Sequence, residues 1–290
     1  MKTVQINKIL IISVLSLLVS SFTGSGKQPV FSAPASGASS FPDPCFTENT
    51  AFQPGEELTY KVYYNWGFVW LSAAEITFRV IDDDDQYHFQ VVGETYDSYN
   101  WFFEVKDYFD SWVMKDNLLP IMSIKSLKEG KYNLYDYLTF DQSRSKIYNE
   151  RGKAKDDIRE HHNFEVESCM HDLVSIVYFA RNVDFEQYQE GSGFPIKLFA
   201  DKETWPLDVT YQGKEPNKKI KGTGRFNTLK FSPKLVDKDL FPNGSQAKVW
   251  LSDDANRVPL VIESPLTVGS VKVILKDYKG LRHELASKVK

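Results

Sequence analysis

Cysteine is scarce in this 290-residue sequence, and the usual catalytic signatures are absent from it. The two cysteines, Cys45 and Cys169, form no CxxC pair, which argues against thiol redox catalysis and against a structural zinc site. The sequence has no HExxH motif, no GxSxG nucleophile motif and no glycine-rich phosphate loop. A pair of carboxylates stays open as catalytic machinery, because 39 acidic residues allow many such pairs.

Long apolar runs are also missing, except for one at the N-terminus. Lys2 and Lys8 precede the apolar stretch 9–19, and small residues follow it, which is typical of a secretory signal peptide over residues 1–21. The stretch is short for a transmembrane helix, and the other interpretations are a buried strand or an uncleaved anchor. No cysteine ends it, which argues against a lipid-anchored lipoprotein. We expect a periplasmic or secreted protein that is not integral to the membrane once the signal is cleaved.

A large excess of one charge is missing as well. The chain carries 35 basic and 39 acidic residues, a formal net charge of −4, and loss of Lys2 and Lys8 with the signal makes it more acidic. Nucleic acids and anionic membrane surfaces attract basic proteins. The charge therefore predicts no nucleic-acid partner.

Export changes the interpretation of the two cysteines. Free thiols are a liability in an oxidising compartment, so Cys45 and Cys169 are predicted to form one disulfide. This bond would tie the start of the mature chain to its middle. The alternative is two free thiols, one buried and one on a flexible tail.

Aromatic and alternating segments are abundant, and they indicate β structure. Residues 22–44 are rich in Pro, Gly, Ser and Ala and predict a flexible leader. Beyond them, short segments alternate apolar and polar residues, and a charged, poorly periodic run covers residues 153–167. We predict one mainly β domain over residues 45–290, a strongly curved antiparallel sheet, β-roll or barrel-like fold with one buried helix.

The helix is predicted at residues 168–182, between two β halves at about 50–160 and 194–290. Ser168 is a suitable N-cap, and Asp172 lies where a helix dipole favours an anion. Between Leu173 and Ala180 only Ser175 is polar, which predicts a helix buried on all sides.

A faint internal repeat suggests that the two halves are related. Residues 112–124 and 250–264 each contain a tryptophan at the end of an apolar strand, a turn with aspartate, and a proline that opens the next strand. Trp112 precedes Pro120 and Trp250 precedes Pro259 at nearly the same spacing. Each copy predicts a β-hairpin.

Two polar clusters could be binding sites, or they could be ordinary hydrogen-bonded turns. Asp253, Asp254, Asn256 and Arg257 could bind a metal or a ligand, but a polar turn explains them better because calcium loops need more oxygen ligands at regular spacing. The acidic run 82–85 is interpreted as a hairpin tip in solvent. No metal and no cofactor are predicted.

The histidines and the serine at 192 give only weak indications of a metal site or a catalytic site. His161 and His162 with Glu165 lack a zinc-binding spacing, and adjacent histidines on a strand point to opposite faces. The His171–Asp172 pair at the start of the helix is more typical of a hydrogen-bonded scaffold. The sequence Gly-Ser-Gly at 191–193 is too short for a nucleophile elbow.

Aromatic side chains are the remaining candidates for ligand binding. Two clusters are rich in them, and a glycine between Trp66 and Phe68 interrupts the strand pattern as a loop at the mouth of a barrel would. Core packing must account for most of these side chains. Exposed ones would suit an acyl chain or the face of a sugar. The predicted binding residues are Tyr64, Trp66, Phe68, Trp70, Tyr99 and Trp101.

Several stretches together resemble the bacterial domain of unknown function 3108 family. They are residues 52–64, the Ala-Ala-Glu at 73–75, the segments 169–173 and 178–181, and residues 250–264 with Gly269. The most specific part is the Trp-Leu-Ser-Asp-Asp run followed by Arg-Val-Pro. The resemblance implies an exported, β-rich protein of Gram-negative bacteria of Bacteroidetes type, and it implies no established activity.

The sequence therefore predicts an exported envelope protein without enzymatic activity that binds or carries an amphiphilic lipid or a glycan. One alternative is an envelope hydrolase that uses a carboxylate pair. Another is a structural partner of another protein in an envelope complex.

Overall fold

The computed structural model describes residues 45–66, 69–100, 104–185, 188–235, 247–265 and 269–290. The predicted signal peptide (1–21) and leader (22–44) lie outside these residues. Fifteen strands form one sheet in the order β8-β7-β6-β5-β4-β3-β2-β1-β14-β13-β12-β11-β10-β9, with β15 paired to β11. Strands β8 and β9, at the two ends of this order, do not pair with each other, so the sheet is not closed into a barrel.

The strands are joined by antiparallel ladders, and β1 pairs with both β2 and β14. The two parts of the chain therefore share one sheet. The strands of the first part are β1 (Glu57–Trp66), β2 (Val69–Asp83), β3 (Gln86–Thr95), β4 (Lys106–Met114), β5 (Pro120–Glu129), β6 (Tyr132–Asp141), β7 (Lys146–Ala154) and β8 (Asp157–Glu165). Those of the second part are β9 (Gly193–Ala200), β10 (Glu203–Ile220), β11 (Gly224–Leu235), β12 (Lys248–Ser252), β13 (Pro259–Pro265), β14 (Ser270–Lys279) and β15 (Lys288–Val289).

Alternation of buried and half-buried residues explains why these segments form strands. Along β4 every second side chain is buried, and β6 follows the same pattern after its first two residues. Successive side chains of a strand point to opposite faces, so one face of the sheet becomes the core. The predicted fold class, a mainly β protein built on a large curved antiparallel sheet, is confirmed.

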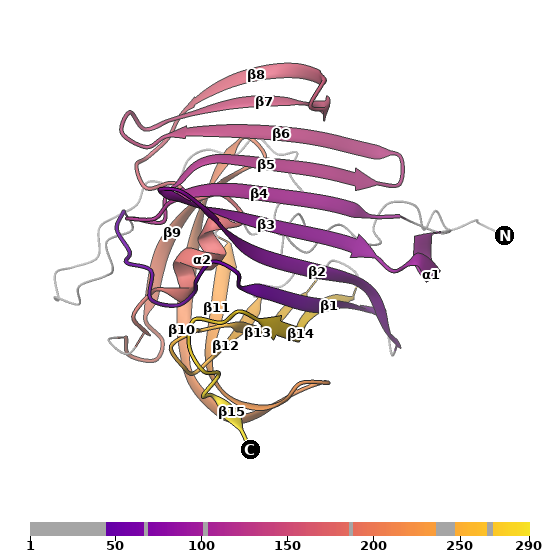
Figure 1. Ribbon diagram of the computed structural model, residues 1–290, viewed down its shortest axis with the longest axis vertical. Helices are drawn as coiled ribbons and strands as arrows, with labels where there is room; N and C mark the ends of the chain where they lie inside the picture. Colours follow the sequence, from indigo (N-terminus) through magenta and orange to yellow (C-terminus); the bar gives the residue numbers. More distant parts are fainter. Residues whose placement is uncertain (1–44, 67–68, 101–103, 186–187, 236–246, 266–268) are drawn as a thin grey trace.

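Strands β1–β8 lie side by side in one curved layer, while strands β9–β12 run across the direction of that layer, with helix α2 (Ser175–Arg181) between them (Figure 1). The main core cluster spans both parts of the chain. It includes Leu58 and Phe89 from the first part, Leu260 and Val273 from the second, and Tyr178 from the helix. A single core therefore holds the two parts together.

Helix α2 is shorter than predicted, because residues 168–174 are not helical. Cys169 has a positive φ of 64°, and His171 pairs with Leu198 as an isolated parallel bridge. Val174 directly precedes the helix and has no side-chain cap, and it is Asp172, not Ser168, that caps the turn leading into the helix: its Oδ1 accepts hydrogen bonds from the backbone amides of residues 174 and 175 at 2.7 and 3.0 Å. A second, four-residue helix, α1 (Asp97–Asn100), follows β3.

Both predicted tryptophan hairpins are present, as β4–β5 and β12–β13, and they share an irregularity. In each, the register shifts directly after the tryptophan, so that Val113 lies opposite Pro120 and Leu251 lies opposite Pro259. The residue two positions before each proline has a positive φ, 58° in the first hairpin and 47° in the second. The faint sequence repeat therefore corresponds to a shared bulge, while common descent of the two halves stays a prediction.

The predicted disulfide between Cys45 and Cys169 is confirmed. It links the first described residue to the segment that leads into helix α2. Among the described residues, no helix is both long enough and apolar enough to cross a membrane.

Candidate functional site

The acidic turn of the β12–β13 hairpin makes its hydrogen bonds within the protein. Asp254 Oδ1 accepts bonds from Ser252 Oγ and from the Asn256 amide, both at 3.0 Å, and its Oδ2 accepts one from the Ser287 amide at 3.0 Å. The buried side chain of Asn256 donates to the His283 carbonyl at 3.1 Å and accepts from the His283 amide at 2.9 Å. The turn therefore holds the C-terminal segment in place.

The two flanking charges of this turn are also engaged. Asp253 forms an ion pair with Lys214 at 3.1 Å. Arg257 donates to the Val183 carbonyl and lies 5.4 Å from the centre of the Phe185 ring. Among the described residues no group of three or more His, Cys, Asp or Glu side chains could hold a metal ion. These contacts support the structural interpretation of the turn.

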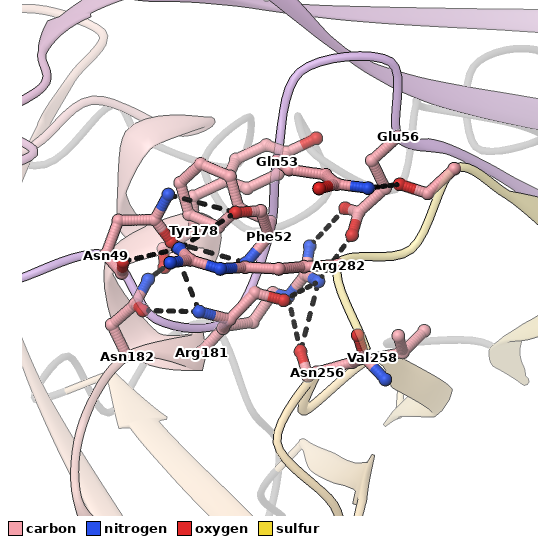
Figure 2. Close-up of polar contacts among 12 residues, drawn as sticks. Asn49, Phe52, Gln53, Glu56, Tyr178, Arg181, Asn182, Asn256, Val258 and Arg282 are labelled. Carbon is pink, nitrogen blue, oxygen red and sulfur yellow. Dashed lines mark hydrogen bonds and ion pairs between the residues drawn. The ribbon is translucent and has the colours of Figure 1, made fainter. Parts of the chain in front are cut away.

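A buried ion pair joins this turn to helix α2. Arg181 makes two bonds with the Glu56 carboxylate, at 2.5 and 2.8 Å, and donates to the Asn256 carbonyl through Nε and Nη2 at 3.1 and 3.0 Å (Figure 2). Burial by itself lowers the pKa of Arg181, but the adjacent Glu56 carboxylate outweighs burial and raises that pKa above its ordinary value. Arg181 therefore stays charged, and its guanidinium is already paired with the Glu56 carboxylate.

The segment before β1 lies against the end of helix α2 (Figure 2). The amides of residues 50 and 51 donate to Asn182 Oδ1 at 2.7 and 3.0 Å, and Arg282 donates to the Asn49 carbonyl at 2.7 Å. The Phe52 ring packs edge-on against Tyr178, with the ring centres 5.0 Å apart. The N-terminal segment, the helix and the C-terminal segment therefore meet at one point.

Beside this meeting point lies an apolar cavity of about 210 Å³. Its walls come from helix α2 and from strands β1, β2 and β9–β14, so both parts of the chain contribute to it. Apolar side chains dominate the lining, among them Phe78, Ile176, Phe194 and Phe231. The cavity is the described feature best suited to hold a ligand.

The few lining residues with polar side chains include two tyrosines, Tyr60 and Tyr178, and the paired Arg181. Burial is the main cause that raises the pKa of Tyr60 and of Tyr178, and the Glu56 carboxylate adds to both shifts. The two hydroxyls are therefore neutral at physiological pH. Tyr178 Oη is buried and has no hydrogen-bond partner among the described residues.

The predicted aromatic residues Tyr64 and Trp70 do not come together. Tyr64 of β1 is buried in the main core, whereas Trp70 of β2 is exposed. In the β1–β2 ladder Tyr64 lies opposite Leu71 and Trp70 lies opposite Asn65, so their side chains point to opposite faces of the sheet. Neither residue lines the cavity.

The other four predicted aromatics cannot be placed. Trp66 ends β1 and Tyr99 belongs to α1, but their side chains lie outside the description, as do Phe68 and Trp101 entirely. Their role in ligand binding stays a prediction.

His171 and Asp172 lie at the start of helix α2 and not on the cavity wall. Burial lowers the pKa of His171 to about 3, so its ring is neutral, and its Nδ1 lies 3.3 Å from Ser175 Oγ. Burial raises the pKa of Asp172, whose Oδ2 accepts a bond from Ser111 Oγ at 2.6 Å. These contacts support the scaffold interpretation.

The remaining polar candidates lie on exposed segments. His162 contacts Glu160 at 2.9 Å on the edge strand β8, and with Lys202 it lowers the pKa of Glu160 to about 2. The acidic run 82–85 includes the turn between β2 and β3, where Lys115 pairs with Asp82. Ser192 immediately precedes β9. None of these residues lines the cavity.

A buried charge network, not foreseen from the sequence, ties the β9–β10 turn to the first part of the sheet. Asp201 lies 2.5 Å from Lys125 and 3.2 Å from Arg151, and Asp136 lies 3.2 Å from Arg151. The residues are far apart in sequence, so no spacing signal could reveal the network. It fixes the β9–β10 turn against strands β5, β6 and β7.

The profile of the family described as "Protein of unknown function (DUF3108)" matches residues 59–276. The chain belongs to this family. No curated protein matches it. Among solved structures, it is similar to a β-barrel-like protein of domain of unknown function DUF1849 from Brucella abortus, with a TM-score of 0.53 and 9% identity over 78% of this chain and 97% of that chain. At this identity the likeness shows the fold alone.

Sequence reasoning missed the residues that line the cavity. Leu58, Tyr60, Ile76 and Phe78 lie on the inward faces of β1 and β2 and alternate like any core residue. Alternation identifies a buried face, but it does not show whether the space in front of that face is filled. No signal in the sequence separates these residues from the rest of the core.

Proposed function

We propose that this DUF3108 protein is an exported binding protein or carrier that holds the apolar part of an amphiphile in the cavity beside helix α2. The apolar lining of that cavity carries the proposal. Ligand sites typically enclose about 300–1,000 Å³, and an apolar cavity of about 150 Å³ stays dry and binds benzene. A volume of about 210 Å³ suits part of an acyl chain.

A lipid fits this cavity better than a glycan. Sugars need several hydrogen-bonding groups, and few of the described lining residues have polar side chains: Tyr60, Tyr178, Ser264 and the already paired Arg181. Burying unpaired sugar hydroxyls against apolar side chains is unfavourable. The same scarcity of polar groups favours binding over catalysis. The described lining residues include no pair of side chains that could act as general acid and general base.

Export to the periplasm is part of the proposal. The apolar N-terminal stretch 9–19 has the pattern of a signal peptide, and the Cys45–Cys169 disulfide fits an oxidising compartment. A carrier in that compartment would shield an acyl chain from water between membranes.

The test is native mass spectrometry and lipid extraction of protein purified from the periplasm, with melting measured in the presence of envelope lipids. We expect a co-purified amphiphile, and a Val209→Trp variant that fills the cavity should lose it. The matched control is Val92→Trp, on a half-buried position of β3 outside the cavity. The proposal fails if no ligand co-purifies and no envelope lipid or glycan raises the melting temperature.

A further inference from the structure

The surface that faces the cavity beside helix α2 is apolar almost throughout. Among the described lining residues only four have polar side chains, and all four are buried: Tyr60, Tyr178, Ser264 and Arg181. The Arg181 guanidinium is also committed to Glu56 and to the Asn256 carbonyl. A ligand inside the cavity therefore meets hydrocarbon and finds almost no group for a hydrogen bond.

The half-buried part of the cavity wall comes from one face of helix α2 and from neighbouring positions on strands β10–β13. Residues three and four apart share a helix face, and three half-buried lining residues of the helix do so: Ile176, Val177 and Ala180. Each of the four strands also contributes half-buried lining residues, which pair across the ladders: Val209 with Pro233, and Val249 with Ile262. The lining residues of β1, β2 and β9 are buried. Apolar surface that the fold leaves half-buried is surface that a hydrocarbon chain can cover favourably.

The volume of the cavity limits the length of chain that it can enclose. An apolar cavity of about 150 Å³ in a protein interior holds one benzene ring. On that scale, a volume of about 210 Å³ encloses about eight carbons of an alkyl chain. Each buried methylene strengthens binding by about fourfold, so affinity should rise with chain length until the cavity is full.

We propose that the cavity selects its ligand by the length of one alkyl chain, with about eight carbons enclosed, and that it does not recognise the head group. The proposal rests on the proposed function and adds the part of the amphiphile that the protein recognises. The ligand class is then a single-chain amphiphile of either neutral or anionic head group. The head group stays in solvent, beyond the apolar surface.

The experiment measures the binding of two homologous series to the purified protein, 1-alkanols and alkanoates at pH 8, with chains from hexyl to dodecyl. Affinities come from displacement of a fluorescent apolar probe, below the concentrations at which the compounds aggregate. In both series we expect affinity to rise by about fourfold per methylene up to about eight carbons and then to reach a plateau. At equal chain length the two series should differ by less than about fivefold, because a charge in solvent contributes little.

Two variants change the length of chain that the cavity encloses. Ile262→Ala enlarges the cavity at a half-buried position and should move the plateau to chains longer by about three carbons, the number that the substitution removes. Ala180→Leu, on the half-buried helix face, adds as many carbons and should move the plateau to shorter chains. The control is Ile121→Ala, at a half-buried position of β5 outside the cavity, which should leave both series unchanged. Melting curves establish that each variant is folded.

Each outcome decides the proposal. It is overturned if affinity rises as steeply up to dodecyl chains, if the two series differ by more than about fivefold at equal chain length, or if the plateau stays in place in folded Ile262→Ala. Any of these results would leave the proposed function standing. If no chain of either series binds, the proposed function fails and this inference fails with it. Should a variant not fold, the plateau and the comparison of the two series in the wild-type protein still decide.

Discussion

The two ends of helix α2 are attached to two similar hairpins by different chemistry. At the N-terminal end Asp172 accepts a hydrogen bond from Ser111 of the β4–β5 hairpin. At the C-terminal end Arg181 donates to Asn256 of the β12–β13 hairpin and pairs with Glu56. The acid and the base each lie at the end where the helix dipole favours their charge.

This difference shows how one hairpin geometry supports two kinds of attachment. Both hairpins carry the bulge after tryptophan, but one contributes a strand hydroxyl and the other a turn carbonyl. Next to the hydrogen bond between Asp172 and Ser111 lies the buried ring of His171, whose pKa is lowered to about 3. Arg181 stays charged because its pKa is raised, and the pair depends on both partners being present.

The largest effect is expected at the C-terminal attachment. Arg181→Leu leaves the Glu56 carboxylate buried without its cation, so the free energy of unfolding should fall by about 3–5 kcal/mol in a denaturant titration. Combining it with Glu56→Leu should recover most of the loss. A single variant that loses less than about 1 kcal/mol would contradict the assignment of this pair as the main attachment.

A smaller loss is expected at the N-terminal attachment. Asp172→Ala removes the helix cap and the partner of Ser111, and should lower the free energy of unfolding by about 2–3 kcal/mol. Ser111→Ala, which leaves the cap in place, should cost less. Equal losses in the two variants would mean that capping contributes nothing.

The turn asparagines test whether the two hairpins differ as the contacts indicate. Asn256→Ala removes the bonds that hold the C-terminal segment and should cost about 2 kcal/mol. Asn117→Ala removes one bond, which the Leu119 amide donates to Asn117 Oδ1 at 2.8 Å, and should cost less than about 1 kcal/mol. Equal losses, measured by thermal or denaturant unfolding, would remove the distinction between the hairpins.

A pH-dependent effect is expected from His171 beside the N-terminal attachment. Its pKa is lowered from 6.5 to about 3 in the folded protein, so its contribution to stability is present above pH 6.5 and is lost as the pH falls towards 3. The slope of the free energy of unfolding against pH from this residue alone approaches about 1.4 kcal/mol per unit.

Replacement of His171 by Gln should reduce this slope, while His161→Gln on exposed β8 should leave it unchanged. Asp172 acts in the opposite sense, because its raised pKa makes its contribution favourable below its ordinary value of 3.8 and lost as the pH rises through the folded value. An unchanged slope in His171→Gln would mean that the buried ring does not titrate in this range.

Local sequence patterns predicted the strands and both hairpins because their causes are local. The alternation along residues 58–64 reflects a strand with one buried face, and the tryptophan–proline spacing reflects one hairpin geometry. Strand β8 was missed because it is an edge strand with exposed side chains on both faces, which leaves no apolar period to detect. Its charged residues suit an exposed edge.

The start of helix α2 could not be predicted because it depends on contacts distant in sequence. Ser168 has the right chemistry for an N-cap, but the disulfide to Cys45, the positive φ of Cys169 and the bridge between His171 and Leu198 keep the preceding segment out of a helix. The turn that leads into the helix begins only after Asp172. The cap residue is therefore set by tertiary pairing.

The sequence by itself determined the β class, the two hairpins and the disulfide, and it indicated export, because each follows from composition or from residues close in the chain. Tertiary structure decided where the apolar cavity forms. The cavity exists because curvature of one sheet brings strands β1 and β2 against β9–β14 around a short helix, and incomplete filling of that space is a property of the whole core. The pairing of Arg181 with Glu56, which removes free charge from the cavity wall, is a contact across 125 positions that no local pattern encodes.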